Sequence, residues 1–138
     1  MFTLPPGTYF FGDPCYVFPH DSAGQECWDR VCNKLEDADV IHANAGTESS
    51  PITVVCGSTA YGDGEYLDQC DNSYPVDSGL FGLVNLDQAE KLVTVPDVSE
   101  VGKTFTSTGP VIFDIPRLGV FYVSYDGTHL FVDTSFEE

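Results

Sequence analysis

The residues best suited to chemistry fall in two segments, and the first is a tight turn near the N-terminus. The run Gly12-Asp13-Pro14-Cys15-Tyr16 places the thiol of Cys15 close to the carboxylate of Asp13. A nucleophilic cysteine needs a lowered pKa, usually from a histidine or another positive group, whereas a neighbouring carboxylate raises the pKa. We therefore interpret Asp13, Cys15 and Tyr16 as turn residues with a packed thiol. A catalytic Cys15 is the alternative.

The second segment combines carboxylates with an aromatic ring; its members are Tyr61, Asp63, Glu65, Asp68 and Asp77. Carboxylate oxygens are ligands for Ca²⁺ and Mg²⁺, and an aromatic ring beside them suits a pocket for a small polar ligand. The glycines on either side of Asp63 allow the backbone to approach a ligand closely. The run does not match the calcium loop of an EF-hand. Two hypotheses follow for residues 61–77: a segment that binds a small ligand or an ion, and a solvated hairpin edge. Ca²⁺ or Mg²⁺ is the only cofactor that we consider.

Other catalytic chemistries lack a motif in this sequence. His20, His42 and His129 stand in unrelated contexts, without the partners of a catalytic triad or a zinc site. There is no P-loop, no GxGxxG fingerprint and no CxxC pair. A small hydrolase using Cys15 or a pair of acids is kept as a third hypothesis. The residue types favour a protein that is not an enzyme.

The charge of the chain is strongly one-sided. Its 138 residues include 22 acidic and 5 basic side chains, which give a formal net charge of -17. The acidic residues are spread along the whole chain. Such a charge disfavours direct binding to nucleic-acid phosphates and to anionic membranes. An acidic surface can instead attract a basic protein surface and speed association with it.

The elements that must position these residues are mostly strands. Ten Phe and seven Tyr supply a core, and 13 Gly and 9 Pro spread along the chain indicate many turns. One amphipathic helix is predicted at about residues 22–36, with Asp21 or Ser22 as its N-cap, because Trp28, Val31, Cys32 and Leu35 recur at helical spacing. The predicted fold is mainly β, with α+β as the variant. It is a single domain, 1–138, with a curled or two-layer antiparallel sheet of short strands against that helix.

Several local predictions concern turns and short strands. We expect strands at 7–12 and 15–18 broken by an Asp-Pro kink, a loop over 37–51, and a hairpin that joins 59–61 to 65–67. Further strands are expected at 52–56, 74–76, 80–84, 92–95, 104–106, 111–115, 120–125 and 130–132. Asp126-Gly127 is a strong signal for a type I′ turn.

The sequence also bears on the compartment. Residues 1–6 show neither a basic segment nor an apolar stretch typical of a secretory signal, and no run is long and apolar enough for a membrane span. Five cysteines are an odd number, so reduced thiols are expected. We expect a cytoplasmic protein, in the host cytoplasm if the chain is viral.

Three motifs together resemble a family of small uncharacterised proteins from phages and bacteria. They are GDPCYV at 12–17, TAYGDGxY at 59–66 and VDSGxxGxV at 76–84. The similarity covers about the first two thirds of the chain. The resemblance implies a viral or phage-related origin and no catalytic activity.

The leading functional hypothesis is an interaction protein, such as a phage accessory factor that binds, and thereby inhibits, a host or viral protein through its acidic surface. One alternative is a binding module for a small ligand or a divalent ion centred on 61–77. The other is a structural or decoration protein of a virion, whose edge strands pair with a neighbour. The oligomeric state is left open.

Overall fold

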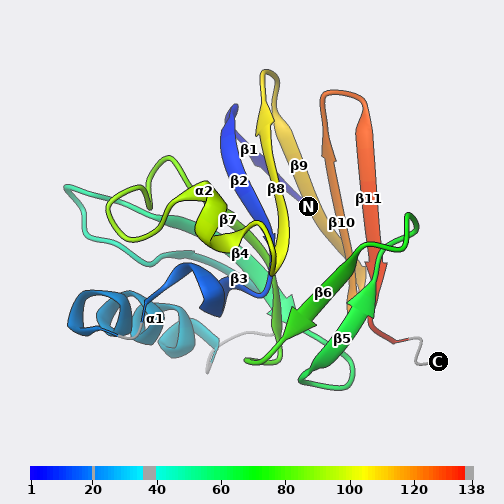
Figure 1. Ribbon diagram of the computed structural model, residues 1–138, viewed down its shortest axis with the longest axis horizontal. Coiled ribbons are helices and arrows are strands. Elements are labelled where there is room, and N and C mark those ends of the chain that lie inside the picture. Colours follow the sequence, from blue (N-terminus) through cyan, green and yellow to red (C-terminus); the bar gives the residue numbers. More distant parts are fainter. Residues whose placement is uncertain (20, 36–39, 136–138) are drawn as a thin grey trace.

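The chain forms three layers: two antiparallel β-sheets lie face to face, and one helix covers the outer side of the larger sheet (Figure 1). The computed structural model describes residues 1–19, 21–35 and 40–135. In chain order the elements are β1 (Phe2–Leu4), β2 (Gly7–Gly12), the 3₁₀ helix η1 (Pro14–Val17), α1 (Ser22–Leu35), β3 (Val40–Asn44), β4 (Thr53–Ser58), β5 (Gly64–Leu67), β6 (Ser73–Val76), β7 (Leu80–Asn85), α2 (Val95–Val98), β8 (Gly102–Ser107), β9 (Val111–Arg117), β10 (Val120–Tyr125) and β11 (Thr128–Asp133). The predicted mainly β fold with one amphipathic helix is confirmed.

The central strands of the larger sheet are largely buried on both faces. Its five strands have the order β3-β4-β7-β2-β8. Side chains alternate between the two faces of a strand, so neighbouring residues enter different cores. In β2, Tyr9 and Phe11 face the smaller sheet, whereas Phe10 faces the helix side. All six residues of β7 are buried, in agreement with the uninterrupted run of apolar residues and glycine over 80–84.

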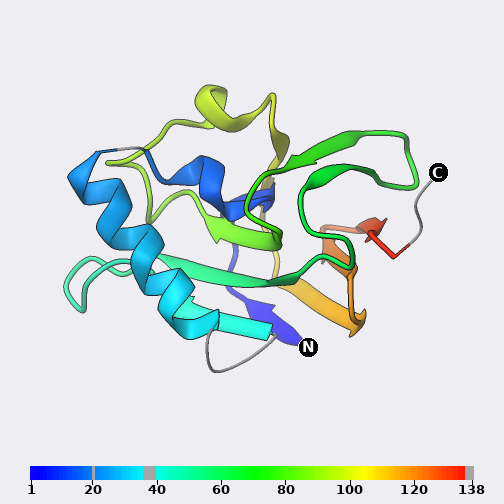
Figure 2. The same cartoon turned by 90° about the horizontal axis from the view of Figure 1, so that it is seen from below.

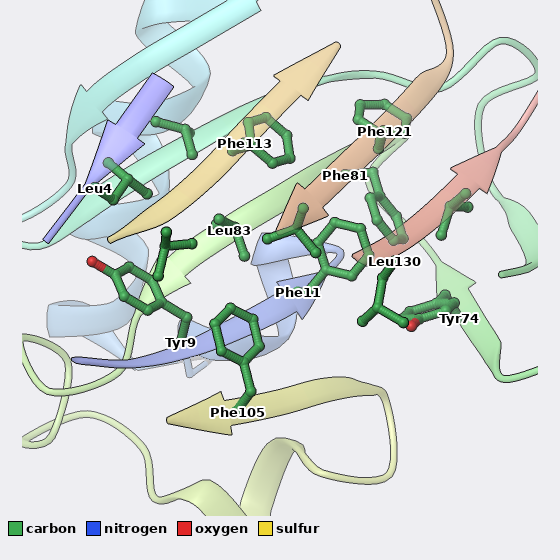
Figure 3. Packing of buried hydrophobic residues seen from close by; sticks show 14 of the residues in the cluster. Leu4, Tyr9, Phe11, Tyr74, Phe81, Leu83, Phe105, Phe113, Phe121 and Leu130 are labelled. Atoms are coloured by element: carbon green, nitrogen blue, oxygen red, sulfur yellow. The ribbon is translucent and has the colours of Figure 1, made fainter. Parts of the chain in front are cut away.

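An aromatic core fills the space between the two sheets (Figure 3). The smaller sheet has the order β1-β9-β10-β11. The ring of Phe81 lies 4.9 Å from that of Phe11 at an interplanar angle of 88°, and 5.0 Å from that of Phe121. Edge-to-face and tilted pairs at such distances add to the free energy gained by burial. The rings therefore join the two sheets.

Helix α1 covers the outer face of the larger sheet. The carboxylate of Asp21 accepts a hydrogen bond from the Gly24 N–H at 2.8 Å, so the predicted N-cap at Asp21 is confirmed. Val31 is fully buried and Cys27 nearly so, while Trp28 stays half-buried beside Phe18. The buried side of the helix thus includes Cys27, which the predicted spacing omitted, together with Val31 from the predicted set.

The two-stranded sheet of β5 and β6 extends the smaller sheet beyond β11. A single antiparallel bridge joins Asp68 to Val132. Seen from below, α1 and the β5–β6 hairpin lie at opposite ends of the molecule (Figure 2).

Three local predictions were wrong near loops. Residues 15–18 are not a strand: Pro14 starts a 3₁₀ turn, and the Asp13 carboxylate caps it by accepting the Cys15 N–H at 2.9 Å. The predicted loop contains strand β3, whose alternate residues are buried against the helix side; residues 37–39 lie outside the described part. Residues 92–95 are not a strand, because Thr94 caps α2 in a capping box with Asp97.

The predicted hairpin of 59–61 with 65–67 does not form. The Thr59 N–H donates to the Gly79 carbonyl and the Ala60 N–H to the Thr134 hydroxyl, so this backbone is engaged elsewhere. Strand β5 pairs with β6 instead. The predicted turn at Asp126-Gly127 is confirmed, with φ values of 45° and 81° between the paired residues Tyr125 and Thr128.

Candidate functional site

A groove of about 540 Å³ runs beside β5 and the end of β11; we call it the β5–β11 groove. Its lining residues are Tyr61, Asp63, Gly64, Glu65, Tyr66, Leu67, Asp68, Gln69, Phe131 and Asp133. Four of the five residues predicted from the central segment are among them. The exception is Asp77.

Large apolar side chains are exposed in this groove. Tyr61 is 58% exposed, Leu67 44% and Phe131 41%. Their exposure follows from the strands: Leu67 and Phe131 point outward at positions whose neighbours Tyr66, Leu130 and Val132 are buried in the core. Exposed apolar residues gathered at one hollow are typical of a binding surface.

The free carboxylates of the groove are those of Asp63 and Glu65. Both residues are exposed, and within the described ranges neither side chain has a hydrogen-bond or ion-pair partner. Asp133 differs, because its carboxylate lies 2.9 Å from the Arg117 guanidinium. Hydrogen bonds from Ser135, and next the pairing with Arg117, lower the pKa of Asp133. The groove therefore offers two unpaired negative charges beside apolar surface.

Asp68 is engaged within its own hairpin. One carboxylate oxygen accepts the N–H groups of Cys70 at 2.8 Å and Asn72 at 3.0 Å, and the other accepts the Asn72 amide and the Tyr74 hydroxyl. Burial acts to raise the pKa of Asp68, but the hydrogen bonds from Asn72 and Tyr74 outweigh it and the pKa is lowered. This carboxylate holds the β5–β6 turn and has little capacity left for a ligand.

Gln69 binds the outer edge of β11 with its side chain. Its Nε2 donates to the His129 carbonyl at 2.6 Å, and its Oε1 accepts the Phe131 N–H at 2.9 Å. The amide thus takes the hydrogen bonds that a further strand would make. It also holds β11 beside the groove.

Asp77, Cys15 and Tyr16 line a different hollow, of about 530 Å³, between η1 and the start of α1; we call it the Trp28 hollow. Its remaining lining residues are Phe18, Pro19, Gly24, Gln25 and Trp28. The Tyr16 hydroxyl donates to the Asp77 carboxylate at 2.5 Å. The residues predicted from sequence thus divide between two sites.

Asp13 is fully buried and connects the two motif segments. Its carboxylate accepts hydrogen bonds from the N–H groups of Cys15, Asp77 and Ser78, and from the Ser78 hydroxyl. Burial, and after it the charge of Asp13, raises the pKa of Cys15 far above its usual range. This environment does not activate the thiol for nucleophilic attack.

Metal ligands do not converge in the described ranges, where no group of three or more His, Cys, Asp or Glu side chains could hold an ion. Four residues that line the groove were not predicted from the sequence: Leu67, Gln69, Phe131 and Asp133. Successive side chains of a strand point to opposite faces, so Phe131 lies on the other face from its neighbours Leu130 and Val132. This alternation was the signal from which the exposure of Phe131 could have been predicted.

Comparisons of the chain with protein families, curated proteins and solved structures give no match. Among the described residues, no helix is both long enough and apolar enough to cross a bilayer.

Proposed function

We propose that the chain is a non-enzymatic interaction protein that binds a basic segment of a partner protein in the β5–β11 groove. The observation that carries the proposal is the exposure of Tyr61, Leu67 and Phe131 beside the unpaired carboxylates of Asp63 and Glu65. Following the resemblance to phage proteins, the partner is a host or viral protein met in the cytoplasm.

The chemistry of the partner follows from the lining of the groove. Aromatic and aliphatic side chains bury apolar surface, and rings such as Tyr61 also attract cations over their faces. Two carboxylates and a net charge of -17 favour lysine and arginine side chains. A peptide with basic residues next to a large apolar residue satisfies both conditions.

The proposal is tested by selecting 12-residue peptides from a random displayed library on the immobilised full-length protein. We expect selected peptides to combine Lys or Arg with an aromatic or aliphatic residue. Phe131→Ser and the double change Asp63→Asn, Glu65→Gln are each expected to weaken their binding by about tenfold or more, since both apolar and charged contacts contribute.

Matched control variants change exposed residues outside the groove. Val95 is 40% exposed on α2, so Val95→Ser controls for loss of an apolar surface residue. Glu90→Gln and Glu100→Gln control for loss of negative charge. Melting curves show that each variant is folded. Peptides that bind the groove variants and the control variants equally well would refute the proposal.

A divalent ion is the alternative occupant of the same groove, through Asp63 and Glu65. Ligand binding at ~100 times the dissociation constant stabilises the folded state by ~2.7 kcal/mol. A rise in melting temperature in millimolar Ca²⁺ or Mg²⁺ that Asp63→Asn abolishes would assign the groove to the ion. An unchanged melting curve leaves the peptide as the occupant.

A further inference from the structure

We propose that the Trp28 hollow is a second binding site, specific for an apolar organic cation: an alkylated ammonium or a guanidinium group. This inference is independent of the β5–β11 groove. The hollow has a volume of about 530 Å³, enough for a small ligand, and its lining joins aromatic rings to a carboxylate.

The walls of the hollow are aromatic. Tyr16, Phe18 and Trp28 all line it, and the rings of Phe18 and Trp28 lie 6.1 Å apart at 37°. Phe18 is 5% exposed, while Tyr16 and Trp28 are half-buried. Electron-rich ring faces attract cations whose hydration is weak, and Trp is the strongest of them.

A fixed carboxylate supplies the negative charge. The Tyr16 hydroxyl donates to one oxygen of Asp77 at 2.5 Å, and the Asp77 N–H donates to Asp13 at 2.7 Å. Asp77 is therefore held from both its backbone and its side chain. Its second carboxylate oxygen has no partner among the described residues, and remains able to accept a hydrogen bond or face a cation.

The N-terminus of α1 also borders the hollow, through Gly24 and Gln25. A helix N-terminus carries partial positive charge, which by itself favours anions. Here Asp21 accepts the Gly24 N–H with its carboxylate and the Gln25 N–H with its carbonyl. The capping carboxylate offsets the dipole, so the charge of Asp77 determines which ligand is preferred.

The site contains its own reporter, because Trp28 is the only tryptophan of the chain. The test titrates the full-length protein with choline and follows tryptophan fluorescence. The uncharged compound of the same shape, 3,3-dimethylbutan-1-ol, is titrated in parallel, and sodium chloride controls for ionic strength. We expect a saturable change with choline and none with the alcohol or the salt.

Two Asp→Asn variants test whether the carboxylate of Asp77 binds the cation. Asp77→Asn keeps an oxygen for the Tyr16 hydroxyl and leaves the backbone bond to Asp13, so the fold should be retained. It should weaken choline binding by about tenfold. Asp71→Asn, at an exposed hairpin position with φ of 65° that asparagine tolerates, should bind choline as the unchanged protein does.

The source of the cation is distinguished by comparing choline with short peptides that carry trimethyllysine or arginine. Tighter binding of a peptide identifies a protein side chain as the ligand, and tighter binding of choline identifies a free small molecule. Equal responses to choline and the alcohol, no response to any cation, or full binding by Asp77→Asn would overturn the proposal.

Discussion

Asp13 and Ser78 are joined by two hydrogen bonds across 65 positions of sequence: the Ser78 N–H donates to one carboxylate oxygen at 2.8 Å and its hydroxyl to the other at 2.6 Å. The same carboxylate caps the 3₁₀ turn through Cys15. One buried side chain thus fixes the position of Asp77 at the Trp28 hollow. The GDPCYV and VDSG motifs are neighbours in space for this reason.

Replacing Asp13 should therefore destabilise the fold. Asp13→Asn keeps the size of the side chain but exchanges one acceptor oxygen for a donor, and leaves part-buried donors without a partner. We expect a loss of ~2–3 kcal/mol in the free energy of unfolding, measured by urea denaturation. Asp71→Asn is the control and should change this free energy little. A loss of less than ~0.5 kcal/mol for Asp13→Asn would contradict the role assigned to the carboxylate.

Asp68 should make stability sensitive to acid. Its pKa in the folded protein is lowered from the ordinary value of 3.8. Its stabilising contribution is therefore present above that value and is lost as the pH falls through the folded pKa. The advantage of the unchanged protein over Asp68→Asn should be constant near neutral pH and shrink below about pH 4, as followed by urea denaturation at several pH values. An advantage that does not vary with pH would contradict the prediction.

The cysteines should differ sharply in reactivity. All five are free thiols. Burial raises the pKa of Cys15, Cys27, Cys32 and Cys56, whereas Cys70 is exposed. Iodoacetamide at pH 8 should label Cys70 first in the native protein, as peptide mass spectrometry would show. Equal labelling of all five thiols after unfolding in urea is the control, and rapid native labelling of Cys15 would revive the catalytic alternative.

Reductant should have little effect on stability, because the structure holds free thiols and no disulfide joins its cysteines. The melting temperature should be the same with and without dithiothreitol. A decrease of several degrees in reductant would reveal a stabilising disulfide.

Salt should stabilise the protein. A net charge of -17 with few basic partners leaves the carboxylates repelling one another. Raising sodium chloride from ~0.01 M to ~0.15 M shortens the range of that repulsion, so the melting temperature should rise. A flat or falling curve would indicate specific ion pairs that outweigh the repulsion.

Pattern and turn chemistry were enough to predict most of the strands and the helix. The run in β7 and the Asp126-Gly127 turn depend on neighbours in sequence, and both were found where expected. The hairpin at 59–67 failed because the Thr59 and Ala60 N–H groups bond Gly79 and Thr134, which sequence spacing cannot show.

The candidate sites were predicted less completely, for a related reason. The β5–β11 groove includes Phe131, from a strand far along the chain from residues 61–69. In the Trp28 hollow, Asp77 lies beside α1, although some 40 residues separate it from the end of that helix in the sequence. The partners of Asp68 lie within six residues of it in its own turn, whereas the carboxylate of Asp63 has no partner among the described residues. Grouping acids by their proximity in sequence merged two sites into one.

Beside the Asp68–Val132 bridge, the outer edge of β11 is covered by the side chain of Gln69. By taking both hydrogen bonds of β11 between His129 and Phe131, Gln69 occupies the positions at which another polypeptide would start to pair. Exposed strand edges are the usual starting points of aggregation and strand exchange. The Gln69 amide therefore leaves these two backbone groups, next to the exposed Phe131, unavailable for pairing with a strand of another molecule.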